Sequence, residues 1–216
     1  MRTGSGCVSE PDKKPLARSP IAPALPVRVV DGWEVSAARS AAPLTLTDVT
    51  PLAKVSVKAS ARGPAETTIG VRFGRARRID AGDLVVGSGP GEWLVIGGIG
   101  SAPAMTEHWR ATTAGAGELV TVLDLTHGRA MLRLTGAHAA DALSTICAID
   151  LRDSVTPDGT AFRSSMAALV TDVVRDDVGG VRSYLLHCER SSGQYLFDAV
   201  LQAGAAFGVE VCGLTT

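Results

Sequence analysis

The sequence predicts an α+β fold built largely from antiparallel sheet. Short stretches with the two-residue alternation of apolar side chains, typical of half-buried strands, dominate the chain from about residue 27 onward. Helical periodicity is confined to three stretches, and these do not alternate regularly with the strands. A doubly wound parallel sheet needs regular βαβα alternation, so its absence favours antiparallel pairing.

The first part of the chain, residues 1–26, is predicted to be a flexible, proline-rich arm. It contains five prolines and few large apolar residues, too few to drive burial. Two further parts are expected after it. Residues 27–118 form a strand-rich half, and residues 119–216 form an α+β half.

In the strand-rich half, the segment Ala53–Ala59 alternates apolar Val55 and Val57 with polar neighbours, as a half-buried strand does. The stretches TTIGVRFG, DLVVG and EWLVIG predict three more strands. A helix is expected from about Pro103 to Ala114, because proline lies in its first turn and glycine follows its end.

In the second half, ELVTVLDLTHGRAMLRLTG predicts two strands with a turn at THG, and GAHAADALSTIC predicts a helix. The glycine-containing DDVGG predicts a hairpin between two apolar runs. A last helix is expected from about Ser192 to Phe207. Ser191 and Gln194 have the spacing of a capping box at its start.

Composition excludes several classes of function. The net charge is -1 and only 4% of residues are aromatic, which speaks against a nucleic-acid partner. No apolar run approaches the roughly 18 residues of a membrane span, and no leader is visible at the start. The chain is therefore expected to be cytoplasmic. Its cysteines lack the spacing of a zinc site and are interpreted as buried thiols; they are Cys7, Cys147, Cys188 and Cys212.

The glycine-rich loop at residues 87–91 looks like the start of a dinucleotide-binding motif. The third glycine position of G-x-G-x-x-G is occupied by Glu92, whose carboxylate would repel a phosphate. The following WLVIGG is typical of a strand, whereas the motif requires a helix. The loop is therefore predicted to be a turn between two strands.

Other polar residues do not form a recognisable catalytic set. His127 lies near Asp124 but is interpreted as a turn histidine, since no nucleophile motif accompanies it. Asp172, Asp176 and Asp177 could suggest a carboxylate cluster, but Asp176 and Asp177 lie at the tip of the predicted hairpin, where aspartate favours turn geometry. Residue chemistry alone thus predicts no active site.

Two segments nevertheless resemble a known family. GPGEWLVI, followed about 25 residues later by VTVLDLTHGRAMLRLTGAHAADALSTICAIDL, is similar to the gamma subunit of heterotetrameric sarcosine oxidase. The likeness covers about residues 40–210. The residues that carry it are Gly89, Pro90, Glu92, Trp93, Leu94, Asp124, Thr126, Gly128, Arg129, Gly136, Cys147, Asp150 and Leu151.

This resemblance implies an aminomethyltransferase-like folate-binding fold with two pseudo-repeated halves. It implies a complex that oxidatively demethylates sarcosine to glycine and passes the one-carbon unit to tetrahydrofolate, or releases formaldehyde and H2O2. It also implies alpha, beta and delta subunits as partners, which hold FAD, FMN, NAD, tetrahydrofolate and zinc. The chain itself is expected to carry no catalytic residue, cofactor or metal.

Aromatic and arginine side chains are the usual anchors of protein interfaces. The candidates for contacts with partner subunits are Trp33, Arg75, Arg77, Arg78 and Trp109.

Two alternatives remain. One is a stand-alone folate-binding protein of the aminomethyltransferase type, in which Arg129, Arg175 or Arg182 would meet the glutamate tail of folate. The other is a scaffold that belongs to no enzyme.

Overall fold

The computed structural model describes residues 15–79 and 82–214, and its strands form three sheets. The largest has six strands in the order β11-β12-β13-β10-β4-β14 and is antiparallel except for the β14–β4 pair. These strands are β11 (Ala161–Met166), β12 (Leu169–Arg175), β13 (Ser183–Glu189), β10 (Arg129–Gly136), β4 (Leu44–Asp48) and β14 (Val209–Cys212).

The second sheet has five antiparallel strands in the order β6-β7-β8-β5-β9. Its strands are β6 (Ala76–Arg78), β7 (Leu84–Gly89), β8 (Glu92–Ile99), β5 (Leu52–Lys58) and β9 (Thr121–Asp124). The α+β, antiparallel-rich fold predicted from the alternating pattern is confirmed. The strand predicted at Ala53–Ala59 is confirmed as β5.

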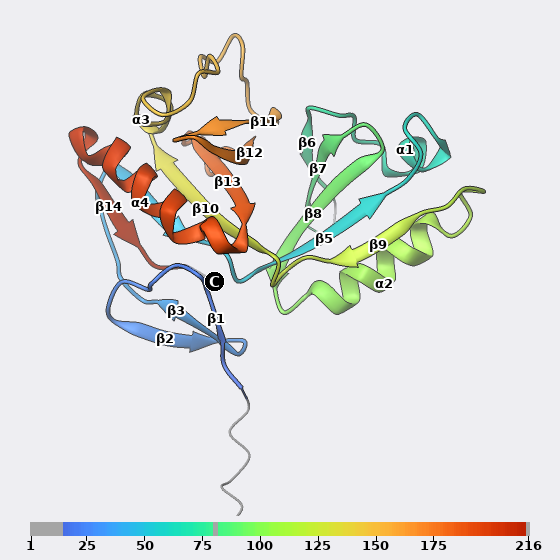
Figure 1. Cartoon of the computed structure of the whole chain (residues 1–216), viewed down its shortest axis with the longest axis horizontal. Helices are drawn as coiled ribbons and strands as arrows, with labels where there is room; N and C mark the ends of the chain where they lie inside the picture. The colour runs from blue at the N-terminus through green and yellow to red at the C-terminus, as the bar shows by residue number, and fades with distance from the viewer. Residues whose placement is uncertain (1–14, 80–81, 215–216) are drawn as a thin grey trace, which may run out of the picture.

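Helices cover the outer faces of both sheets, while the inner faces meet each other (Figure 1). α3 (Ala139–Ser144) and α4 (Gly193–Gly204) pack on the six-stranded sheet through a core that includes Leu143, Leu196 and Val200. α1 (Pro64–Ile69) and α2 (Ala102–Thr113) lie on the five-stranded sheet. A third apolar core fills the space between the sheets; it includes Val86, Leu94, Met131, Val174 and Leu185.

The boundary expected at residue 118 does not separate the two sheets. β4 precedes that boundary yet lies inside the six-stranded sheet, and β9 follows it yet forms the edge of the five-stranded sheet. The chain therefore crosses between these sheets after β4 and again after β9. The two strands predicted around the turn at THG are confirmed as β9 and β10, but they do not pair with each other, because they belong to different sheets.

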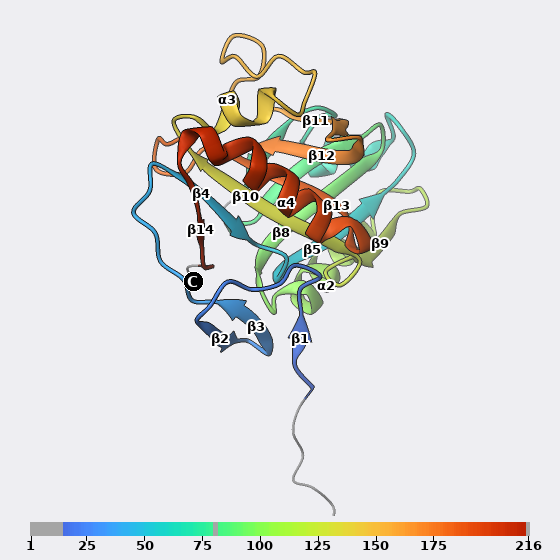
Figure 2. The same ribbon diagram turned by 60° about the vertical axis from the view of Figure 1, so that its left-hand side comes forward.

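The described part of the predicted arm, residues 15–26, is packed against the body. β1 (Ala17–Arg18) pairs in parallel with β3 (Trp33–Ser36), and β2 (Val27–Val30) completes a three-stranded sheet (Figure 2). Ile21 is only 1% exposed and belongs to the core beneath α4. This apolar anchor corrects the expectation of a flexible arm for residues 15–26. Residues 1–14, with Cys7, lie outside the described residues.

Of the predictions for single elements, the helices are confirmed, whereas one strand and the capping box are wrong. TTIGVRFG is not a strand: its first residues complete α1, which begins at Pro64 and is ended by Gly70 at a φ of 69°. The expected helices near Pro103 and Ser192 are confirmed as α2 and α4. The capping box is wrong, because Gln194 Oε1 instead accepts a hydrogen bond from the backbone N–H of Ala22 at 2.7 Å. Within the described residues no helix could cross a membrane.

Candidate functional site

A row of polar side chains crosses the inner face of the six-stranded sheet. Arg163 of β11, Asp172 of β12, His187 of β13 and Met131 of β10 stand opposite one another in successive strand pairs. Directly opposed residues of neighbouring strands project to the same face. Three polar residues are therefore brought side by side by strand register, although up to 24 sequence positions separate them.

This row forms one wall of a pocket of about 290 Å³ between the two sheets. The opposite wall comes from the five-stranded sheet. The side chains around the pocket are mainly polar or charged: Ser56, Lys58, Ser88, Glu92, Trp93, Leu94, Leu125, Arg129, Arg163, Asp172 and His187. Lys58 and Glu92 pair with each other at 3.0 Å across this second wall.

Asp172 is the anionic centre of the row. Its side chain is 9% exposed and accepts two hydrogen bonds from Arg163, at 2.8 and 3.2 Å. The same contact raises the pKa of the Arg163 guanidinium. Arg129 Nη2 lies 4.0 Å from Asp172 Oδ2, and Arg129 pairs more closely with Glu189, at 2.8 Å. Two guanidinium groups thus compensate the buried charge of Asp172.

His187 is buried and has no hydrogen-bond partner among the described residues. The residue is 3% exposed, and neither ring nitrogen makes a hydrogen bond with the described residues. Nδ1 lies 3.5 Å from Asp172 Oδ2. Burial lowers the pKa of the imidazole to about 4, despite the nearby carboxylate, so the ring is neutral near pH 7. An unpaired buried polar atom costs about 1 to 3 kcal/mol, so these nitrogens mark the pocket as a place for water or a ligand.

Two further reactive groups, Lys54 and Cys188, are restrained by their surroundings. Lys54 Nζ donates to the backbone carbonyls of Thr50 (2.6 Å) and Leu52 (2.7 Å), and burial lowers its pKa to about 7. Cys188 is buried, which raises the pKa of its thiol to about 11. Lys54 braces the crossover between β4 and β5, and the Cys188 thiol is a poor nucleophile at neutral pH.

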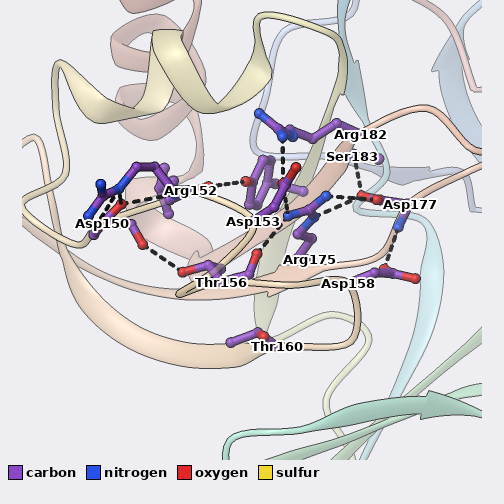
Figure 3. A network of polar contacts seen from close by, with 12 residues as sticks. Asp150, Arg152, Asp153, Thr156, Asp158, Thr160, Arg175, Asp177, Arg182 and Ser183 are labelled. Carbon is purple, nitrogen blue, oxygen red and sulfur yellow. Dashed lines mark hydrogen bonds and ion pairs between the residues drawn. The ribbon is translucent and has the colours of Figure 1, made fainter.

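A second polar cluster occupies the other end of the β12–β13 pair (Figure 3). Arg175 donates to Asp153 at 2.6 Å, to the carbonyl of Thr156 at 2.7 Å, and through two hydrogen bonds to Asp177. Arg182 shares the Asp153 carboxylate at 2.5 Å. Every branch of the Arg175 guanidinium is occupied. The cluster therefore fastens the loop 150–160 to the hairpin and leaves Arg175 unavailable for a ligand.

The structure thus separates the three arginines considered for a folate tail. Arg129 alone of the three lines the inter-sheet pocket, while Arg175 and Arg182 belong to the loop-fastening cluster. The aspartates also divide: Asp172 faces the pocket from within β12, Asp176 pairs with Arg78 and Arg133, and Asp177 pairs with Arg175. His127 lies in a turn as predicted, where its ring stacks on Trp33 at a centroid distance of 4.7 Å.

The glycine-rich loop is confirmed as a strand–turn–strand connection. β7 and β8 pair antiparallel on either side of Pro90 and Gly91, and Gly91 adopts a φ of 72°. Gly87 serves another purpose: a Cβ there would lie 2.2 Å from the carbonyl oxygen of Arg72. The glycine lets the segment before β6 pack directly on the backbone of β7. These glycines therefore serve chain packing.

The interface candidates differ sharply in exposure. Trp33 and Trp109 are 5% and 4% exposed and pack in two separate cores, so the expectation that they anchor a surface contact is corrected. Removing the large apolar surface of these rings from water stabilises the folded chain. Arg75 and Arg77 are exposed. Arg78 pairs with Asp176 at 2.7 Å.

Sequence reasoning missed the Arg163–Asp172–His187 row. Each residue is a single polar position in an otherwise strand-like segment, so none forms a motif. The available signal was Asp172 and His187 within the apolar runs LVTDVV and YLLHC. A charged residue inside such a run indicates a buried polar site. Only the pairing of the strands shows which of these side chains lie next to each other. Among the described residues, no group of three or more His, Cys, Asp or Glu side chains could hold a metal.

Comparisons with known proteins agree with this architecture. A chain of the heterotetrameric sarcosine oxidase of Corynebacterium sp. U-96, solved with pyrrole 2-carboxylate, matches with a TM-score of 0.67 and 21% identity, covering 81% of this chain and 90% of that chain. The glycine cleavage system aminomethyltransferase T of Bartonella henselae also gives a TM-score of 0.67, at 15% identity, covering 87% of this chain and 55% of that chain. No curated protein sequence matches. The family model of the GCVT N-terminal domain matches residues 81–216, and the chain belongs to this family.

Proposed function

We propose that the chain is a non-catalytic, gamma-type subunit of a heterotetrameric sarcosine oxidase. The observation that carries the proposal is the extent of the structural likeness. The chain follows 90% of the length of a chain from such an enzyme, whereas it spans 55% of the aminomethyltransferase. The segments quoted for the family resemblance form the β7–β8 hairpin and the stretch from β9 to α3, which are central parts of this fold.

In this proposal the complex acts in the cytoplasm with alpha, beta and delta subunits as partners. It removes two electrons from the N-methyl group of sarcosine, reduces O2 to H2O2, and yields glycine. The one-carbon unit passes to tetrahydrofolate or is released as formaldehyde. FAD, FMN, NAD, tetrahydrofolate and zinc are held by the partner subunits, and the chain contributes packing surface.

The state of the chain's own reactive groups supports a non-catalytic role. His187 is enclosed and neutral, Cys188 is a buried thiol of raised pKa, and Lys54 is bound to two carbonyl groups. Asp172 is held between Arg163 and Arg129. A general base needs access to a substrate proton, and a nucleophile needs an accessible, ionised form. None of these four groups meets its requirement in this arrangement.

The test is purification of the tagged full-length chain from its native cell. We expect flavin-containing chains to co-purify and the complex to consume O2 when sarcosine is added. The same chain expressed alone should carry no flavin absorbance and show no oxygen uptake. Sarcosine oxidation by the isolated chain with bound flavin would overturn the proposal.

A second candidate, a stand-alone folate-binding protein of the aminomethyltransferase type, is favoured by one feature. His187, whose ring nitrogens make no hydrogen bond with the described residues, and Arg129 line one pocket between the sheets. Such groups could hold the polar edge of a ligand. Calorimetric titration of the isolated chain with tetrahydrofolate separates the candidates. Binding heat that His187→Phe abolishes, and that the exposed-site control His108→Phe retains, would support the second candidate.

A further inference from the structure

The backbone of residues 72–76 is held from both sides at the corner where the two sheets meet. On one side, Gly74 N–H donates to Gly87 O at 2.9 Å, and Phe73 forms a parallel bridge with Gly87 of β7. On the other side, Ala76 N–H donates to Gly159 O at 2.7 Å, and Ala161 N–H donates to Gly74 O at 3.0 Å. The side chains on this short segment are thus displayed from a fixed backbone.

This corner carries exposed positive charge. Arg72, Arg75 and Arg77 are exposed, and none forms an ion pair with a described residue. Within the described part of the chain, the side chain of Arg75 makes one weak hydrogen bond, to Thr160 Oγ1 at 3.4 Å. Arg78 differs, because it forms an ion pair with Asp176. Three guanidinium groups therefore point into solvent within six residues, on a chain whose overall charge is -1.

An exposed aromatic ring lies among these charges. Phe73 is 60% exposed, although the chain has only four phenylalanines and buries most of its large apolar side chains. Arginine and large aromatic residues are enriched at the energetic centres of protein interfaces. A fixed backbone also lowers the entropy lost when a partner binds.

We infer that the surface formed by Arg72, Phe73, Arg75 and Arg77 docks an acidic protein surface that offers an apolar recess for Phe73. The inference rests on the proposed function for the class of partner, which is another subunit of the same complex. Complementary charge favours an acidic protein. A nucleic acid is disfavoured because the basic surface is one short corner and the whole chain carries a slight negative charge.

Site-specific photocrosslinking tests this docking surface. The full-length tagged chain carries p-benzoylphenylalanine at Phe73 in its native cell, and a matched chain carries it at Val170, which is 65% exposed on β12. After irradiation, the crosslinked peptide is identified by mass spectrometry. We expect the Phe73 probe to crosslink a protein segment rich in Asp and Glu, and the Val170 probe to leave that segment unlabelled.

A second experiment reverses the charge of two arginines in the docking surface. The double variant Arg75→Glu/Arg77→Glu should reduce the Phe73 crosslink at least about tenfold, and about 0.5 M NaCl should weaken it as well. The control Arg39→Glu/Arg110→Glu has the same change in net charge at sites elsewhere on the chain and should crosslink like the wild type. Thermal melting shows that both double variants are folded.

The outcomes separate this inference from the proposed function. Failure to crosslink at Phe73 while the flavin chains co-purify would overturn the docking surface and leave the proposed function standing. A crosslink to an acidic segment of a protein outside any oxidase, lost on charge reversal, would retain the surface and overturn the proposed function. A crosslink to RNA, to a neutral or basic protein segment, or one insensitive to charge reversal would overturn the inference.

Discussion

The two faces of the β12–β13 strand pair differ in how fully the buried polar side chains are hydrogen-bonded. Arg175 and Asp172 are three positions apart on β12, so they project to opposite faces. On one face, Arg175 has a partner for every branch of its guanidinium and fixes a loop (Figure 3). On the other, His187 is equally buried and has no hydrogen bond with any described residue. A buried side chain whose hydrogen-bonding groups all have protein partners belongs to a structural network. A buried side chain that lacks such partners beside a pocket indicates a ligand-binding site.

Replacement of the centre of the satisfied network should have the largest effect. Arg175→Met removes the cation that pairs with Asp177, leaves Asp153 with Arg182 alone, and leaves the Thr156 carbonyl without its donor. We expect the free energy of unfolding to fall by about 2 to 4 kcal/mol. The lower part of that range applies if Asp153, which is 66% exposed, regains water. Denaturant titration measures the change.

The control for this network is Arg152→Met. Arg152 is 78% exposed and pairs with its near neighbour Asp150, so its loss should barely move the midpoint of unfolding. An Arg175 variant as stable as the Arg152 variant would show that the network does not hold the loop.

Burial of the neutral His187 imidazole should make the free energy of unfolding depend on pH. The pKa of His187 is about 4 in the folded chain and near 6.5 when unfolded. Between these values the unfolded chain binds a proton that the folded chain refuses, so stability falls as pH drops from 6.5 to 4. The contribution from this one residue reaches about 3 kcal/mol at the low end of the range.

Comparison with His187→Asn isolates that contribution from other titrating groups. The stability of wild type relative to the variant should fall as the pH is lowered from 7 to 4. His108→Asn, at an exposed position, provides the control. Parallel pH profiles for wild type and His187→Asn would contradict the assignment of a buried neutral imidazole.

Substitution of Gly87 tests the close packing of residues 72 and 73 on β7. A methyl group there would collide with the Arg72 carbonyl, so Gly87→Ala should destabilise the chain by about 1 to 3 kcal/mol. Gly98→Ala in β8 is the matched control, since nothing lies within 4 Å of its added Cβ. Equal melting temperatures for the two variants would show that the close approach of residues 72 and 73 to β7 does not stabilise the fold.

The smallest effect is expected at the turn that sets the register of Arg163 against Asp172. Ala167 and Ala168 connect β11 and β12 with φ values of 47° and 65°, which L-residues with a Cβ rarely adopt. Ala168→Gly should therefore stabilise the chain by about 0.5 to 1 kcal/mol. Thermal melting measures the gain, and a loss of stability would mean that the turn is not strained.

The sequence by itself determined the fold class and the meaning of its most suggestive loop. Alternating apolar residues predicted β5, and the apolar runs DLVVG and EWLVIG predicted β7 and β8. Glu92 with the strand after it was enough to exclude a phosphate loop. These conclusions were reachable because they depend on neighbours along the chain. The helix α1 escaped the same reasoning, since TTIGVRF satisfies strand propensity while Pro64 and Gly70 supply the ends of a helix.

Only the tertiary structure decided which residues meet. Arg163, Asp172 and His187 are aligned by the register of three strands, and a shift by one residue would turn each side chain to the other face. Burial was likewise decided by packing, which placed Trp33 and Trp109 inside and left Phe73 outside. The composition of a segment limits what it can bury, but the pairing of distant strands determines which polar groups share a pocket and which aromatic rings remain exposed for a partner.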